Sequence, residues 1–127
     1  MSQKFTILFD LDGTLVNTAP DLMHAHNHVM KKYGYDERKL SDIKKLAGRG
    51  SKIMLTKSMH EIAELSGKVK KTDDIIEEMT KEFIDYYSKN IAIESTLKTG
   101  AIDFFLHQDK KCIVPFLSVL SSAIFLL

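Results

Sequence analysis

An apolar run that ends abruptly in two closely spaced carboxylates is the feature that most limits the fold of this chain. Residues 5–9 read Phe-Thr-Ile-Leu-Phe, and Asp10-Leu11-Asp12-Gly13-Thr14 follows directly. A run without apolar–polar alternation is typical of a strand covered on both faces in a parallel sheet. Ligands bind at the carboxyl ends of such strands, so we expect Asp10 and Asp12 at a site. Both side chains must converge, so the chain has to leave strand geometry by Gly13, which supplies the conformational freedom.

Two carboxylates at this spacing suit phosphoryl transfer. Asp10 can attack phosphorus and form an aspartyl phosphate, provided that a cation such as Mg²⁺ offsets the repulsion between two anions. Asp12 can protonate the leaving alkoxide and later take a proton from the attacking water. Thr14 can donate its hydroxyl or its N–H toward the phosphoryl oxygens. The alternative is an Asp-Gly turn, but a turn requires neither the second aspartate nor the preceding buried strand.

Three motifs follow one another in a fixed order along the chain. Residues 9–22 read Phe-Asp-Leu-Asp-Gly-Thr-Leu-Val-Asn-Thr-Ala-Pro-Asp-Leu, residues 48–50 read Gly-Arg-Gly, and residues 94–100 read Glu-Ser-Thr-Leu-Lys-Thr-Gly. The first resembles the first motif of the haloacid dehalogenase superfamily, and Thr-Ala-Pro-Asp-Leu narrows the resemblance to its phosphoglycolate phosphatase-like branch. The second resembles the substrate-facing loop of the helical cap in that branch, and the third resembles the return from cap to core.

The resemblance implies an α/β fold in which a helical cap is inserted into a partial Rossmann-like core. Residues 1–18 and 92–127 then belong to the core and residues 19–91 to the cap. It also implies Mg²⁺-dependent hydrolysis of a small phosphorylated metabolite such as 2-phosphoglycolate, in the cytoplasm. Asp10 is then the nucleophile and a Mg²⁺ ligand, and Asp12 is the general acid and base with its main-chain carbonyl on Mg²⁺. Thr14 and Arg49 are expected to contact the substrate.

Helix signals fill the segment between the first motif and the return. The apolar spacing and the Pro, Ser, Thr and Gly positions predict helices over residues 20–33, 41–48, 51–67 and from Thr72 onward, and a further helix over 101–110. In the fourth helix, one apolar face is expected to contain Ile75, Met79, Phe83 and Tyr86.

The last 16 residues, 112–127, carry no charge and contain Pro115, which is unfavourable in a central strand. The family's phosphate-binding Ser or Thr pattern, its later lysine and its later acidic pair have no counterpart, so we expect an incomplete core, through truncation or a reading-frame shift. A membrane anchor is disfavoured, because a spanning helix needs about 20 residues. Two alternatives to an active phosphatase stay open, namely an inactive fragment or interaction remnant and a sugar phosphomutase. Haloacid dehalogenation has no use for Asp12.

The charge balance and the positions of the histidines limit which molecules and ions the chain can bind. With 18 basic and 17 acidic residues, the chain lacks the electrostatic signature of a nucleic-acid-binding protein. His24 and His28 share a helix face without a third ligand, which favours a solvent-facing pair over a zinc site. Arg49 can bind an anionic substrate group or stand solvated in a turn. The single Cys112 excludes an intramolecular disulfide, and nothing in the sequence indicates the oligomeric state.

Overall fold

The computed structural model describes residues 10–66 and 73–106. The predicted strand at residues 5–9, the capping Thr72 and the apolar tail at 112–127 lie outside the described residues. Seven elements are present in the order β1 (Val16–Asn17), α1 (Ala19–Lys32), α2 (Leu40–Leu46), α3 (Ser51–Ser66), α4 (Asp73–Lys89), β2 (Thr96–Leu97) and α5 (Ala101–Leu106). All five predicted helices are therefore confirmed within the described part of the chain.

The end of α1 shows how local sequence sets a boundary. Gly34 has φ +79°, its N–H donates to the Lys31 carbonyl at 3.1 Å, and the Tyr35 N–H donates to the Met30 carbonyl at 2.8 Å. This is the Schellman arrangement, in which a left-handed residue satisfies the last carbonyls of a helix. The stop predicted at Gly34 is confirmed.

The start of α2 differs from the prediction. The helix begins at Leu40 and is preceded by Lys39, whose side chain makes no capping hydrogen bond. The Lys39 carbonyl instead accepts the N–H groups of Asp42 at 3.0 Å and Ile43 at 3.1 Å. Because main-chain bonds close the first turn, Ser41 is not needed as a cap.

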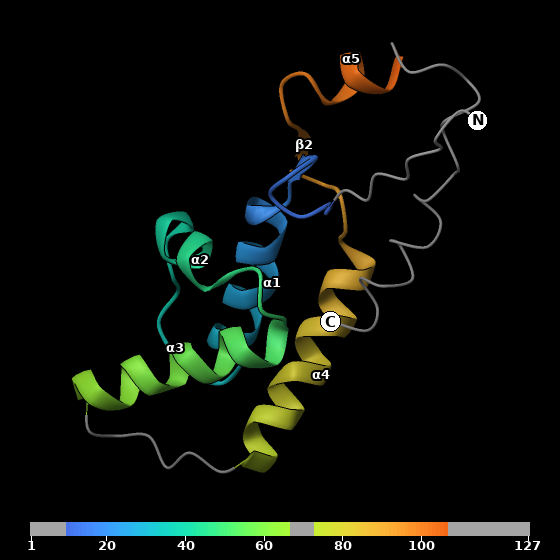
Figure 1. Cartoon of the computed structure of the whole chain (residues 1–127). Coiled ribbons are helices and arrows are strands. Elements are labelled where there is room, and N and C mark those ends of the chain that lie inside the picture. The colour runs from blue at the N-terminus through green and yellow to red at the C-terminus, as the bar shows by residue number, and fades with distance from the viewer. Residues whose placement is uncertain (1–9, 67–72, 107–127) are drawn as a thin grey trace, which may run out of the picture.

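Helices α1 to α4 form a four-helix unit around one apolar core. Helix α1 packs against α2 and α4, and α3 packs against α2 and α4. Figure 1 shows α1 and α4 extending from α3, with the β1–β2 ribbon and α5 at the opposite end. The core consists of Ala25, Val29, Met30, Ile43, Leu46, Met54, Leu55, Met59, Ile76, Met79, Phe83 and Tyr87.

The buried face of α4 is shifted from the predicted one. Its buried residues are Ile76, Met79, Phe83 and Tyr87, whereas Ile75 and Tyr86 are only partly buried. Tyr86 instead stacks on His28 of α1, with ring centroids 4.2 Å apart. The predicted apolar face therefore packs against the core, with Ile75 and Tyr86 at its edge and Tyr87 as the buried tyrosine.

The three histidines of α1 have separate surroundings. His26 is fully buried, its Nε2 lies 2.8 Å from the Ser58 hydroxyl of α3, and burial lowers the pKa of its imidazole. His24 pairs with Glu94 at 3.1 Å and His28 with Glu82 at 2.8 Å. No group of three or more metal-ligating side chains occurs in the part of the chain that the structure describes. The expected separation of His26 is confirmed, but His28 is packed on Tyr86 rather than fully solvent-facing.

The β1–β2 ribbon joins the two ends of the four-helix unit. Its strands are antiparallel, with Val16 opposite Leu97 and Asn17 opposite Thr96. The Lys98 N–H donates to the Leu15 carbonyl at 2.8 Å, which extends the pairing by one bond. The segment that enters the four-helix unit and the segment that leaves it are therefore held side by side.

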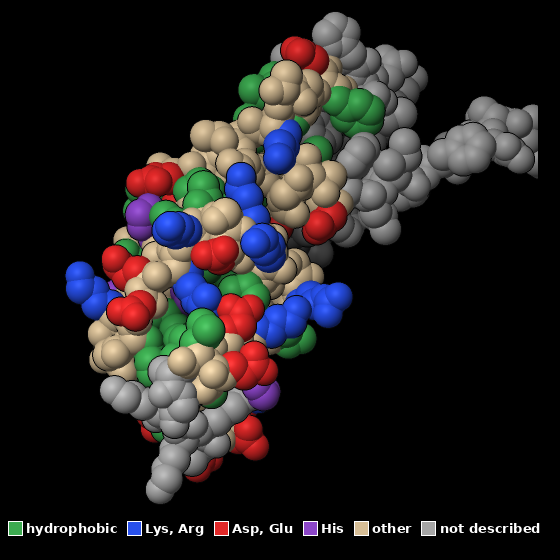
Figure 2. Space-filling view, turned by 90° about the vertical axis from the view of Figure 1, so that its left-hand side faces the viewer, with side chains coloured by type: hydrophobic (Ala, Val, Ile, Leu, Met, Phe, Trp, Pro, Cys, Tyr) green, Lys and Arg blue, Asp and Glu red, His purple; other side chains and the backbone are tan. Residues whose placement is uncertain are grey.

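The surface carries charges of both signs. Figure 2 shows Lys and Arg side chains interspersed with Asp and Glu over the visible face of the molecule. None of the helices within residues 10–66 and 73–106 is both long enough and apolar enough to span a membrane.

Candidate active site

The aspartates lie in a tight loop before β1. The Leu11 carbonyl accepts the N–H groups of Leu15 at 3.1 Å and Val16 at 3.0 Å, and Gly13 donates to the Val16 carbonyl at 2.7 Å. Gly13 has φ +80°, which L side chains rarely adopt, although a Cβ there would have open space. The glycine is therefore required by backbone conformation, as predicted.

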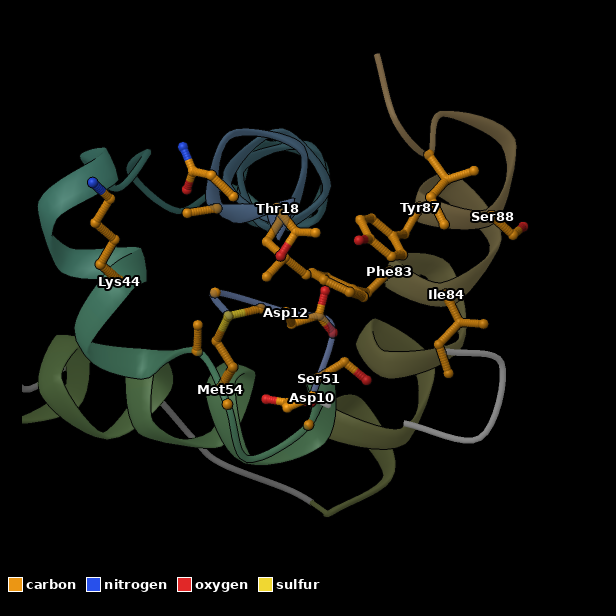
Figure 3. Close-up of a pocket in the computed structure, with 18 of the residues that line it drawn as sticks. Asp10, Asp12, Thr18, Lys44, Ser51, Met54, Phe83, Ile84, Tyr87 and Ser88 are labelled. Atoms are coloured by element: carbon orange, nitrogen blue, oxygen red, sulfur yellow. The ribbon is translucent and has the colours of Figure 1, made fainter. Parts of the chain in front are cut away.

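This loop faces a cavity of about 470 Å³ between itself and the four-helix unit. Figure 3 shows Asp12 between Asp10 and Tyr87 in the view drawn. The remaining lining residues come from the loop and the segments next to the ribbon, from α1, α2, α3 and α4 and from the α2–α3 connection, and they include two lysines. They are Gly13, Asn17, Thr18, Ala19, Leu22, Lys44, Ala47, Gly48, Gly50, Ser51, Met54, Phe83, Ile84, Ser88, Ile91 and Lys98.

One carboxylate oxygen in the cavity has no partner among the described residues. Asp12 Oδ1 is buried and accepts no hydrogen bond from any described residue. An unpaired buried polar atom is costly, so such an atom in a cavity indicates a missing ligand. Mg²⁺ takes oxygen ligands, is held by one or two carboxylates, and keeps waters or phosphate oxygens in its other positions. The Asp10 carboxylate and the Asp12 main-chain carbonyl fit that ion, and the unpaired Asp12 Oδ1 is left to face a bound substrate.

Tyr87 closes the cavity from the side of α4. Its ring is 7% exposed and stacks on Phe83 with a centroid distance of 5.9 Å. Burial raises the pKa of its hydroxyl to about 12, and the negative charges of Asp12 and Asp21 add to that increase. The phenol therefore stays protonated, and it can act as a hydrogen-bond donor but not as a base at neutral pH.

Asp21, in the first turn of α1, binds the chain where it returns from α4. Its Oδ1 accepts the Glu94 N–H at 2.8 Å, and its Oδ2 accepts the Ser95 N–H at 3.0 Å and the Ser95 hydroxyl at 2.5 Å. Asp21 is only 3% exposed. We call this set of three hydrogen bonds the Asp21 clasp. It joins the return segment to α1 next to the β1–β2 ribbon.

Comparison with known proteins places this arrangement in a family. Residues 7–107 match the haloacid dehalogenase-like hydrolase family. The chain belongs to the haloacid dehalogenase-like hydrolases.

Curated relatives in this family are named phosphoglycolate phosphatases. One from Mesorhizobium japonicum is 31% identical over 104 residues, which cover 82% of this chain and 44% of that protein. One from Caulobacter vibrioides is 33% identical over 99 residues, which cover 77% of this chain and 39% of that protein. The crystal structure of a predicted phosphoglycolate phosphatase from Haemophilus somnus 129PT is similar with a TM-score of 0.66 and 25% identity, over 73% of this chain and 41% of that one. The chain thus spans less than half the length of these relatives.

The predicted fold class is confirmed by the family and by its solved structure. The four-helix unit is the helical cap, and the loop at residues 10–15 with the ribbon and α5 is part of the α/β core. The division at residues 18/19 and 91/92 stays a prediction, although the ribbon lies close to both positions.

The four predicted site residues differ in where the structure places them. Asp10 and Asp12 line the cavity together. Thr14 and Arg49 are exposed, and neither is among the lining residues. Arg49 is flanked by Gly48 and Gly50, which do line the cavity. Its side chain therefore starts at the cavity edge rather than inside it.

Four residues that line or support the site were not predicted from sequence. They are Asp21, Lys44, Tyr87 and Lys98. Asp21 lies within the first motif, on the same helix face as the apolar Ala25 and Val29. An acidic residue on an apolar helix face is a signal of a buried polar contact that the sequence does contain. Tyr87 follows Phe83 by four residues, so it lay on the apolar face of the helix, where its hydroxyl is easily overlooked.

Proposed function

We propose that this site hydrolyses small phosphomonoesters, with 2-phosphoglycolate as the leading candidate substrate. The observation that carries the proposal is the cavity in which Asp10 and a buried, unpartnered Asp12 oxygen face the helical cap. Phosphoglycolate phosphatase is the name of the similar curated proteins from Mesorhizobium japonicum and Caulobacter vibrioides. The cavity volume of about 470 Å³ suits a small ligand.

Asp10 and Asp12 divide the reaction between them. An Asp10 oxygen attacks phosphorus, the bond from phosphorus to the ester oxygen breaks, and Asp12 transfers its proton to the leaving alkoxide. Water then attacks the aspartyl phosphate and gives its proton to Asp12. The acyl-phosphate bond breaks at phosphorus, which releases inorganic phosphate and restores the Asp10 carboxylate.

Charge compensation is required because two anions must meet. Mg²⁺, held by Asp10 and by the Asp12 main-chain carbonyl, would supply positive charge at the phosphoryl oxygens. Lys44 and Lys98 also line the cavity, and no ion pair to another described residue occupies either of them. We further propose that Arg49, at the cavity edge, and Thr14 contact the substrate once it is bound.

We also propose a cytoplasmic location for the protein, with which its single cysteine agrees.

Steady-state hydrolysis tests the proposal. The purified chain is assayed with Mg²⁺ against 2-phosphoglycolate and other phosphomonoesters, and Asp12→Asn is expected to lower turnover by about 10²–10⁴-fold. Asp36→Asn, which changes an exposed acid away from the cavity, is the matched control. Turnover that is unaffected by Asp12→Asn would contradict the mechanism. Absence of any turnover would favour the inactive interaction remnant.

A further inference from the structure

The Tyr87 hydroxyl is a hydrogen-bond donor without an acceptor. No hydrogen bond joins it to any residue in the described ranges 10–66 and 73–106, although its ring is buried and it lines the cavity. A phenolic hydroxyl that opens onto a cavity can donate to a ligand bound there. The neighbouring Ser88, also from α4, donates its hydroxyl to the Asp85 carbonyl at 2.9 Å and is already satisfied. Tyr87 is therefore an open donor that α4 directs at the cavity.

The position of Tyr87 relative to the two aspartates fixes which part of a ligand it can meet. Asp12 lines the same cavity as Tyr87, and its negative charge contributes to the raised pKa of the Tyr87 hydroxyl. Figure 3 agrees, since Asp12 lies between Tyr87 and Asp10 in that view. In the mechanism above, phosphorus lies at Asp10 and the leaving oxygen at Asp12. Tyr87 thus lies on the leaving-group side.

We propose that Tyr87 binds the organic part of the substrate, donating its hydroxyl hydrogen to a carboxylate oxygen of a phosphorylated hydroxy acid. This inference rests on the proposed phosphomonoesterase function and adds the residue that selects among phosphomonoesters. Lys44 and Lys98 supply positive charge to the same cavity, which offsets the repulsion between the substrate carboxylate and Asp12. A simple alkyl phosphate offers Tyr87 no acceptor and gains nothing from it.

Ligand binding tests this inference without relying on turnover. All chains carry Asp10→Asn so that no ligand is hydrolysed, and binding of 2-phosphoglycolate and of ethyl phosphate is measured with Mg²⁺ present. Tyr87→Phe is expected to weaken 2-phosphoglycolate binding by about 10- to 100-fold, as for loss of a hydrogen bond to a charged acceptor, and to leave ethyl phosphate binding within about twofold. Tyr86→Phe is the matched control, because Tyr86 stacks on His28 outside the cavity and should change neither affinity.

A second readout needs no change at Tyr87. In a chain with ¹³C-labelled tyrosine rings, the Tyr87 signal should shift on addition of 2-phosphoglycolate and stay in place with ethyl phosphate. Equal loss of both affinities in Tyr87→Phe, or no loss of either, would overturn the inference while the phosphomonoester site stands. Failure of either ligand to bind the unmodified chain, which keeps both Asp10 and Tyr87, would overturn the proposed function itself.

Discussion

Replacing Asp21 by asparagine tests how firmly the Asp21 clasp holds the return segment. Asparagine has the same shape as aspartate but only one acceptor oxygen and no charge. That oxygen can still accept the two hydrogen bonds from Ser95, which then lose their charge assistance. The asparagine N–H₂ group faces the Glu94 N–H, so the bond from Glu94 is lost. One charge-assisted bond is lost, at about 1.5–3 kcal/mol, and the other two are weakened to about half. The clasp should therefore be destabilised by about 3–6 kcal/mol.

Hydrogen exchange measures this loss directly, because the return segment can detach without unfolding the helices. The Glu94 and Ser95 amides should exchange at least about 100-fold faster in Asp21→Asn, since about 1.4 kcal/mol corresponds to tenfold. Amides at the centre of α4 should change little. Asp85→Asn is the control, because Asp85 makes only an exposed pair with Lys89 and its loss costs about 0.5 kcal/mol. Equal exchange at Glu94 in the two variants would refute the stabilising role of the clasp.

Three further changes test the helical cap. Burial holds the pKa of His26 below its ordinary value of 6.5, so the unfolded chain binds the proton more readily than the folded chain. The stability that depends on neutral His26 should be fully present above pH 6.5 and should fall as the pH drops below it. Urea unfolding at about pH 7.5 and about pH 5.5 checks this. Ser58→Ala leaves His26 Nε2 without its partner and should cost about 1–3 kcal/mol in the same measurement. Gly34→Ala should cost about 1–2 kcal/mol because of its positive φ, and Gly34→Asn, which tolerates that conformation better, should cost less.

The helices were predictable where local chemistry decides them. The Gly34 stop and the starts of α1 and α3 follow from residues adjacent in sequence. The buried face of α4 was not predictable in full, because Tyr86 and Tyr87 are chemically alike: Tyr87 packs into the core, and Tyr86 stacks on His28, which is far away in sequence. The strands β1 and β2 contain two residues each, which is too short to show any apolar periodicity.

The candidate site could be proposed from sequence only where one segment contains its residues. Asp10 and Asp12 directly follow an apolar run, and this pattern alone suggests their chemistry. Asp21 and Tyr87 acquire their roles from distant residues: the partners of Asp21 lie 73 and 74 positions later, and Tyr87 meets Asp12 only through the fold. Their side chains are ordinary in sequence and become informative only when the cap is placed over the loop.

Trapping the phosphorylated chain tests the central claim most directly. The purified protein is incubated with 2-phosphoglycolate and Mg²⁺, quenched in acid to preserve an acyl phosphate, and mapped by mass spectrometry. Phosphate on Asp10, lost on treatment with hydroxylamine and absent in Asp10→Asn, is the predicted result. Phosphate on any other residue, or trapping that persists in Asp10→Asn, would contradict the assignment of Asp10 as the nucleophile.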